Sequence, residues 1–304
     1  MEISRLAPSP TGLLHPGNIW SFMCCWLAVR RSGGRIILRV DDIDGPRSRQ
    51  EYIEAIFRDL KWLGFDWDGK PTRQSDRIEL YANVLNNLRD RGLVYPCFCS
   101  RAELRAMASA PNRGDLAANY PGTCRDLTDE ERAAKLLTHS QFALRIKTPD
   151  SDFRFRDLVL GERRSANCGG DIAALRSDNV FSYQFATAVD DFLLDASLIV
   201  RGADLVDSTP AQIYIRSLLG DKPVSFAHIP LLLAPNGERL AKRHKSESVA
   251  ALREKGWTAE RIIGRLAFIG GLSETDRSVS LAELIRLFAW ERIPRRDLVW
   301  NGEL

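Results

Sequence analysis

Short apolar runs and longer stretches with helical spacing alternate over the first part of the chain. Residues 18–31 are rich in Trp, Phe, Met, Cys and Leu and predict a buried helix, which the pair Gly33-Gly34 ends. A short strand is expected at residues 3–6 and a buried strand at residues 36–40. A strand, a helix and a second strand of these lengths indicate a parallel sheet with a right-handed crossover.

Two amphipathic helices are predicted next, one with apolar residues at positions 53, 56, 57, 60 and 63 and one over about residues 77–91. Between residues 100 and 140 the pattern is polar and irregular, which indicates an insertion into the parent fold. Strands are expected again within residues 142–147, 153–160 and 197–200, a helix within residues 183–189, and mainly helices after about residue 245.

The composition is that of a globular protein large enough for a nucleotide-binding domain and one or two smaller units, with 304 residues, 44% apolar and 27% charged. The net charge of +3 argues neither for nor against nucleic acid, because a basic stripe can lie on a neutral protein. No run approaches the roughly eighteen apolar residues of a transmembrane helix, and the N-terminus lacks the layout of a secretory signal. We therefore expect a cytoplasmic protein that does not bind membranes.

The turn after the first strand is a candidate phosphate site. The residues His15-Pro16-Gly17-Asn18 open the predicted helix, and a glycine-containing turn at a helix N-terminus offers backbone N–H groups and the positive end of the helix dipole to a phosphate. His15 could add a hydrogen bond to a polyphosphate. A single histidine in a turn is more often an ordinary surface residue, so the wider sequence has to decide.

That wider sequence resembles the glutamyl-tRNA synthetases, which are class I aminoacyl-tRNA synthetases. Residues 5–12 (RLAPSPTG) and 15–18 (HPGN) resemble the family's opening segment and its HIGH signature, and residues 239–243 (RLAKR) resemble its KMSKS signature. Further matches to the family occur at residues 39–44, 59–64, 74–75, 95–97 and 201–205. Departures from the signatures place Asn18, Asp41, Arg239 and Ala241 where His, Glu, Lys and Ser are usual.

The resemblance implies an α/β fold with a Rossmann-type, parallel-sheet class I synthetase core. Residues 1–95 would form the first half of the core, and residues 181–245 the second half with the lysine loop. Residues 96–180 would form a zinc-bearing α+β insertion that binds the acceptor. Residues 246–304 would form a short helical region that contacts the RNA stem.

The resemblance also implies a pocket for L-glutamate. This substrate carries two carboxylates and one ammonium group, so its pocket needs arginines and an acid. By resemblance, Arg5 and Arg201 contact the carboxylates and Asp41 holds the α-ammonium; the alternative for Arg201 is a surface ion pair with Asp204. The remaining residues expected to form the pocket are Leu6, Ala7, Pro8, Ser9 and Tyr183.

ATP is the implied co-substrate. The glutamate α-carboxylate would attack the α-phosphate of ATP in line and release pyrophosphate, a step that depends on positioning and charge stabilisation rather than on a side-chain nucleophile. His15, Gly17, Asn18 and Lys242 are expected to bind ATP, with His15, Asn18 and Lys242 as the catalytic residues. Mg²⁺ is expected because it neutralises the leaving pyrophosphate.

Three cysteines in the predicted insertion suggest a zinc site. Cys97 and Cys99 lie two residues apart and Cys124 follows 25 residues later, which would supply three ligands of a tetrahedral site; the alternative is a set of unligated thiols. Spacing leaves the fourth ligand open among His139, Glu103 and Asp126. Residues 120–124 (YPGTC) resemble the Tyr-x-x-x-Cys element of the glutamyl-queuosine tRNA(Asp) synthetases, which favours Tyr120 and one structural Zn²⁺ per chain.

The extent of the chain favours the same relatives. Glutamyl-tRNA synthetases continue into helical domains that bind the anticodon, whereas this chain ends at Leu304. By resemblance to the glutamyl-queuosine tRNA(Asp) synthetases, we expect a monomer that activates glutamate without tRNA and transfers it to queuosine in the anticodon loop of tRNA(Asp). The alternatives are a truncated synthetase that charges the tRNA 3′ end, and a catalytically silent RNA-binding paralogue.

Overall fold

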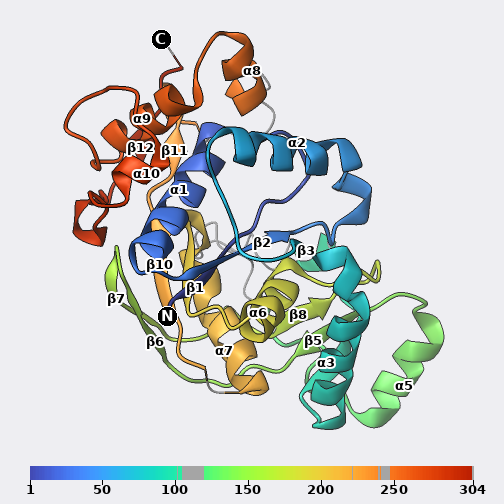
Figure 1. Cartoon of the computed structure of the whole chain (residues 1–304). Coiled ribbons are helices and arrows are strands. Elements are labelled where there is room, and N and C mark those ends of the chain that lie inside the picture. Colours follow the sequence, from blue (N-terminus) through green and yellow to red (C-terminus); the bar gives the residue numbers. More distant parts are fainter. Residues whose placement is uncertain (101, 105–119, 221, 239, 241–246, 303–304) are drawn as a thin grey trace.

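The computed structural model describes residues 1–100, 102–104, 120–220, 222–238, 240 and 247–302 (Figure 1). Its central feature is a parallel sheet, as the strand–helix–strand pattern predicts. One part of this sheet has the order β1 (Ile3–Leu6), β2 (Arg35–Val40) and β3 (Thr72–Arg73). The other part has the order β7 (Gly161–Ser165), β6 (Phe153–Asp157), β10 (Ser225–Ile229) and β9 (Leu198–Gly202).

The two parts of the sheet meet where β1 lies beside β9. The backbone N–H of Ser197 donates to the carbonyl of Ile3 at 2.9 Å, and the Ser197 hydroxyl accepts from the backbone N–H of Ile3. All the pairings inside the two parts are parallel except that of β6 with β7. The carboxyl ends of β1, β9 and β10 therefore lie at one edge, where open α/β sheets bind ligands.

The helices expected from the sequence are present within a few residues of their predicted bounds. The long buried helix is α1 (Pro16–Arg31), and the two amphipathic helices are α2 (Gln50–Trp62) and α3 (Ile78–Asp90). The later helices are α6 (Tyr183–Leu193), α7 (Thr209–Leu219), α8 (Val249–Glu254), α9 (Ala259–Ile269) and α10 (Leu281–Leu284). A short pair of strands, β11 (Leu232–Leu233) and β12 (Leu298–Val299), links the C-terminal part to the core.

The segment between residues 100 and 140 contains a helix that the sequence analysis did not predict. This helix, α5 (Asp129–Thr138), buries none of its residues. Its sequence signal is the capping box of Thr128 and Glu131, in which each side chain bonds to the other residue's backbone N–H. The expectation of irregular structure is therefore wrong for residues 129–138.

The same segment is framed by an antiparallel sheet of β4 (Val94–Cys97), β5 (Ala143–Ile146) and β8 (Ile172–Leu175). Its neighbours in sequence, β6 and β7, belong instead to the central sheet, because β6 pairs with β10. In Figure 1, α5 and the C-terminal helices α9 and α10 lie at opposite ends of the molecule. The proposed four-part division of the chain stays a prediction.

The main core forms around α1. Trp20, Met23 and Leu27 of this helix are 0–1% exposed and belong to one cluster with Leu6 of β1 and Leu266 of α9. Burial of each such large side chain contributes about 1.5–3 kcal/mol. The helix that opens the candidate phosphate site is therefore held rigidly between the sheet and the C-terminal helices.

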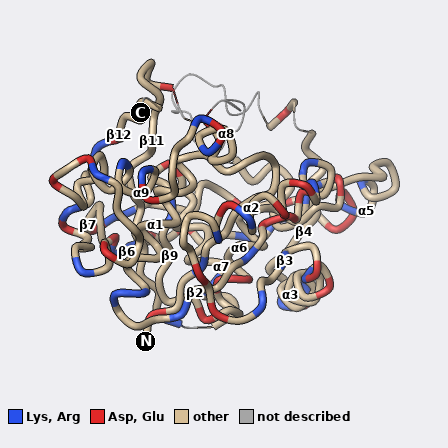
Figure 2. The backbone as a smooth tube through the Cα atoms, turned by 45° about the horizontal axis from the view of Figure 1, so that its top comes forward, with Lys and Arg blue, Asp and Glu red and all other residues tan. Residues whose placement is uncertain are grey.

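Charged residues of both signs are interspersed along the backbone (Figure 2), in keeping with the net charge of +3. Across the described residues, none of the helices has the length and apolar character needed to cross a membrane.

Candidate active site

A cavity of about 380 Å³ opens at the carboxyl ends of β1, β9 and β10. Its wall includes the turn that follows β1, the N-terminus of α1 and the segment that follows β9. It brings together nine of the residues predicted to bind glutamate or ATP: Arg5, Ala7, Pro8, Ser9, His15, Gly17, Asn18, Tyr183 and Arg201. Asp204, to which the sequence analysis assigned no ligand, also lies on this wall.

Three predicted residues are placed differently. Leu6 is fully buried in the main core, and Asp41 is 5% exposed and does not form part of the cavity wall. Lys242 lies outside the described residues, as do the neighbouring signature positions Arg239 and Ala241.

The turn His15-Pro16-Gly17-Asn18 forms the start of α1. Pro16 occupies the first helical position, where its missing N–H is no loss, and the Asn18 side-chain oxygen accepts from the backbone N–H of His15 at 3.2 Å. A Cβ added at Gly17 would lie 3.0 Å from the His15 ring, so glycine leaves room for the ring. Asn18 thus caps this turn in the place where the common signature has histidine.

Arg201 projects from β9 and is 4% exposed, so it is a buried residue rather than a surface one. All three of its nitrogens donate to side chains: Nε to His228 Nε2 at 3.0 Å, Nη1 to Gln212 Oε1 at 2.6 Å and Nη2 to Thr209 Oγ1 at 2.7 Å. Burial lowers the pKa of Arg201 to about 10, which leaves it charged at neutral pH.

His228 of β10 is held in turn by Asp157 of β6. The His228 Nδ1 lies 2.6 Å from Asp157 Oδ2, and both residues are buried. Burial lowers the pKa of His228, so the neutral form is favoured. Burial raises the pKa of Asp157, but hydrogen bonds from His228 and the backbone outweigh it and leave that pKa below its usual value.

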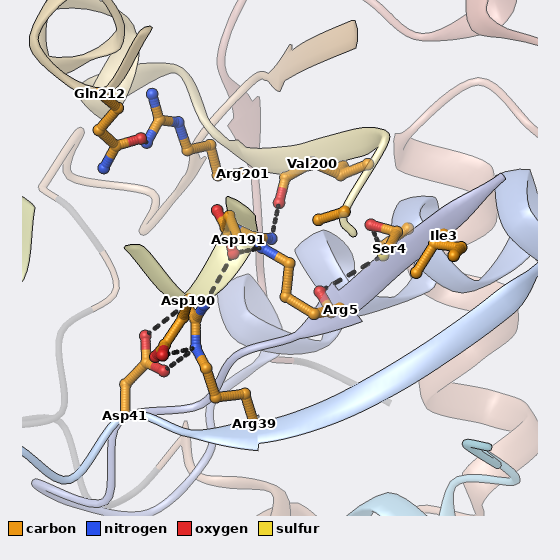
Figure 3. A network of polar contacts seen from close by, with 12 residues as sticks. Ile3, Ser4, Arg5, Arg39, Asp41, Asp190, Asp191, Val200, Arg201 and Gln212 are labelled. Carbon is orange, nitrogen blue, oxygen red and sulfur yellow. Dashed lines mark hydrogen bonds and ion pairs between the residues drawn. The ribbon is translucent and has the colours of Figure 1, made fainter. Parts of the chain in front are cut away.

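Arg5 belongs to a second buried network, shown in Figure 3. Its Nε donates to Asp191 Oδ1 at 2.9 Å, and its Nη1 donates to the carbonyl of Val200 at 3.3 Å. The same Asp191 oxygen accepts from Arg39 Nη1 at 2.7 Å. Arg39 also donates to both oxygens of Asp41, at 2.6 and 3.1 Å. In this network, Asp41 is therefore an ion-pair partner of Arg39.

The neighbouring Asp190 joins this network to α3. Its carboxylate accepts from Gln74, Arg77 and Tyr81 at 2.7–3.0 Å. Because β1 and β2 supply the arginines and α6 supplies Asp190 and Asp191, the network ties the N-terminal strands to the later part of the core.

Sequence reasoning missed most of the residues that hold these arginines in place. Arg39 lies inside the apolar run 36–40, and the pair Asp190-Asp191 lies within an otherwise apolar helix. Charges within buried segments need partners, so these positions carried a detectable signal. His228, Gln212 and Asp157 carried none that distinguishes them from ordinary polar residues.

The three predicted cysteine ligands lie together at the end of β4. The sulfur atoms of Cys97, Cys99 and Cys124 are all within 4.8 Å of one another, with 3.7 Å between Cys99 and Cys124. Tetrahedral zinc–sulfur bonds of about 2.3 Å would put sulfur atoms about 3.8 Å apart. The thiols therefore fit a zinc ion.

Tyr120 fits the fourth position better than His139 or Glu103, two of the three residues left open by spacing. Its hydroxyl oxygen accepts from the backbone N–H of Cys124 at 2.7 Å, which places the oxygen beside the cluster. His139 instead bonds to Thr138 and to the Lys135 carbonyl, and Glu103 accepts from the backbone N–H of Ser100.

Comparison with known proteins identifies the family of this chain. The model of the catalytic domain of class I tRNA synthetases (E and Q) matches residues 3–300. A glutamyl-Q tRNA(Asp) synthetase of Nitratidesulfovibrio vulgaris is 47% identical over 99% of this chain and 96% of that protein. One of Symbiobacterium thermophilum is 45% identical, covering 98% of this chain and 95% of that protein. The chain belongs to the glutamyl-Q tRNA(Asp) synthetase family. It is thus a class I ligase, as the resemblance of its signatures predicts.

Glutamate–tRNA ligases are also similar to this chain, but over a smaller share of their own length. The ligase of Aquifex aeolicus is 37% identical, covering 99% of this chain and 64% of that protein. Among solved structures, a glutamate tRNA ligase of Elizabethkingia meningosepticum in complex with its amino acid superimposes with a TM-score of 0.83 at 26% identity. That match covers 99% of this chain and 67% of that one. The fold of a class I synthetase catalytic core is thereby confirmed.

Proposed function

We propose that this chain uses ATP to convert L-glutamate to glutamyl-adenylate without tRNA, and then transfers the glutamyl group to queuosine in the anticodon loop of tRNA(Asp). The observation that carries the proposal is that one cavity is lined both by two buried arginines, Arg5 and Arg201, and by the N-terminus of α1. The arginines suit a substrate with two carboxylates. The helix N-terminus suits a polyphosphate.

The two arginines differ in a way that assigns them to different carboxylates. The α-carboxylate loses its charge when it becomes a mixed anhydride with phosphate, whereas the side-chain carboxylate stays charged throughout. Arg5 already has Asp191 as its counter-charge, and Arg201 donates to three neutral acceptors. Binding that is stronger before the reaction than in the transition state slows catalysis. We therefore assign Arg201 to the side-chain carboxylate and Arg5 to the α-carboxylate.

Arg201 has donors left for this role. A guanidinium carries five N–H groups, and three are used by His228, Gln212 and Thr209. The remaining two, one on each Nη, have no acceptor among the residues that the structure describes, and they are available to a ligand in the cavity whose wall Arg201 helps to form. Asp41 stays our candidate for the α-ammonium group, since carboxylate oxygens that bond to Arg39 keep further lone pairs.

ATP would bind at the start of α1. His15 and Asn18 line the cavity there, and Gly17 leaves space for the His15 ring. These residues would orient the triphosphate so that its α-phosphate faces the glutamate carboxylate. Lys242 stays our candidate for the cation at the pyrophosphate end, and Mg²⁺ would neutralise that leaving group.

The choice of acceptor rests on the relatives. The two glutamyl-Q tRNA(Asp) synthetases are 45–47% identical to this chain, against 37% for the Aquifex ligase. We accordingly propose tRNA(Asp) bearing queuosine as the acceptor, rather than the 3′ end of a tRNA. We also propose that the chain acts as a monomer.

Pyrophosphate exchange tests the first half of the proposal. With ATP and Mg²⁺ but no tRNA, we expect exchange to depend on glutamate and to be at least about 100-fold slower with glutamine or aspartate. Absence of exchange with every amino acid would overturn the proposal.

A transfer assay tests the second half of the proposal, the choice of acceptor. Labelled glutamate should be incorporated into tRNA(Asp) that lacks its 3′-terminal adenosine, but not into tRNA(Asp) without queuosine. Incorporation that requires the terminal adenosine would show charging of the 3′ end instead.

We further propose that Cys97, Cys99, Cys124 and Tyr120 hold one structural Zn²⁺. Bound zinc would fix the loop after β4 to the segment around residue 124. Replacing Cys97 with serine should lower the zinc content from about one per chain to near zero, because three remaining ligands hold the ion far less tightly. Elemental analysis of the purified protein measures this. Cys168→Ser, at a buried cysteine outside the cluster, should keep its zinc, and full zinc in Cys97→Ser would contradict the site.

A further inference from the structure

The buried arginines of the active site are held by two different kinds of partner. Arg5 and Arg39 each donate to a carboxylate, at 2.9 Å and 2.6 Å. Arg201 donates to an imidazole, an amide oxygen and a hydroxyl, all of them neutral. Figure 3 shows Gln212 beside the Arg201 guanidinium, apart from the group that joins Arg5, Asp191 and Arg39. Arg201 is thus oriented without being neutralised by the groups that orient it.

Asp157 keeps the His228 imidazole in the form that can accept a hydrogen bond from Arg201 without carrying a charge. His228 Nε2 can accept from Arg201 Nε only when His228 is neutral and carries its proton on Nδ1. The Asp157 carboxylate 2.6 Å from Nδ1 accepts that proton in a hydrogen bond and so selects this form. Asp157 also accepts from the backbone N–H groups of Val159, Leu160 and His228 itself. Four donors therefore hydrogen-bond to the Asp157 carboxylate, and none of them belongs to Arg201.

We propose that Gln212, Thr209 and His228 form an uncharged cradle that sets the specificity of this enzyme for glutamate over glutamine. The inference rests on the proposed function, in which Arg201 binds the side chain of the substrate. The cradle fixes the direction of the guanidinium and leaves its charge to be matched by the ligand. Glutamate supplies a carboxylate for that charge. Glutamine supplies only a neutral amide to the buried charge of Arg201, on which Asp191 and Asp204 also act electrostatically, so the ligand contributes no charge of its own to that cation, which is costly.

The cradle places these residues in a positioning and charge-setting role, separate from contact with the substrate. All three are 0–1% exposed, and they come from β10 (His228) and α7 (Thr209 and Gln212). A carboxylate in place of any cradle acceptor would give Arg201 a counter-charge of the protein's own. The site should then favour a neutral ligand side chain.

Gln212→Glu tests this directly, because it keeps the acceptor oxygen and the size of the side chain while adding a negative charge. We expect the KM for glutamate in pyrophosphate exchange to rise about 100-fold or more, through repulsion of the ligand carboxylate. The KM for ATP should stay within about threefold. The ratio of kcat/KM for glutamate to that for glutamine should fall by a similar factor of about 100.

Gln212→Met is the matched control, since it removes the acceptor without adding charge. It should weaken glutamate and glutamine together and leave their ratio within about threefold, because the charge of Arg201 is unchanged. Equal loss of selectivity in the two variants would overturn the proposal, and so would unchanged selectivity in a folded Gln212→Glu. Thr209→Asp, at the first residue of α7, where the helix dipole favours a negative charge, provides the same test should Gln212→Glu fail to fold. If the unaltered protein shows no exchange with glutamate, it is the proposed function that fails.

Discussion

Replacing Arg201 with alanine should reduce glutamate-dependent pyrophosphate exchange to the limit of detection. Loss of one partner from a buried, hydrogen-bonded charge pair costs about 2–5 kcal/mol, or about 30- to 4,000-fold in affinity. The upper end applies here, because the same change also leaves three buried acceptors without the donor they bond to. The assay is exchange at saturating ATP over a range of glutamate concentrations.

Arg164→Ala is the control for this experiment. Arg164 pairs with Asp152 on the surface, where its side chain is 65% exposed. Its removal should leave exchange within about twofold of the unaltered protein, because exposed ion pairs contribute little. Near-normal exchange in Arg201→Ala would remove Arg201 from the glutamate site, and with it the argument for the cradle.

The parts of the active site that lie in one continuous segment could be predicted from the sequence. Arg5, Ser9, His15 and Asn18 come from the end of β1, the turn and the start of α1, so a short run of residues specifies their common location. Strand, helix and strand periodicity likewise predicted the parallel sheet, because each period reflects which face a local segment buries.

The partners of Arg201 could not be predicted in this way. Gln212 and His228 lie 11 and 27 residues after Arg201, and Asp157 lies 71 residues before His228, so these side chains meet only through the packing of α7, β10 and β6. Nothing in the local pattern of a polar residue states which distant donor it will accept from. The prediction missed helix α5 for the opposite reason. Its helical preference is local, but the helix has no buried face to mark it.

Asp191→Asn is expected to cause the largest loss of stability among changes that preserve side-chain shape. One oxygen of Asp191 accepts from both Arg5 and Arg39, and the side chains of all three residues are 0–4% exposed. Removing the charge leaves Arg5 buried beside Arg39 without the carboxylate that both share. Breaking a buried pair in this way costs about 3–5 kcal/mol. Urea unfolding followed by tryptophan fluorescence should show a lower midpoint with an unchanged slope.

Asp276→Asn provides the matched comparison, because Asp276 also lies between two arginines, Arg261 and Arg265, but at a more exposed site where its side chain is 24% exposed. Loss of the Asp276 charge should cost about 0–1 kcal/mol, and equal losses of stability in the two variants would contradict the role assigned to burial.

Burial raises the pKa of Asp191, but Arg5 and Arg39 outweigh it and bring that pKa below its usual value. The stabilisation from Asp191 is therefore fully present above about pH 4 and is lost only as the pH falls further. The difference in unfolding free energy between the unaltered protein and Asp191→Asn should accordingly stay constant between about pH 6 and 8. In Asp191→Asn, kcat/KM for glutamate should also fall, because Arg5 loses the partner that orients it.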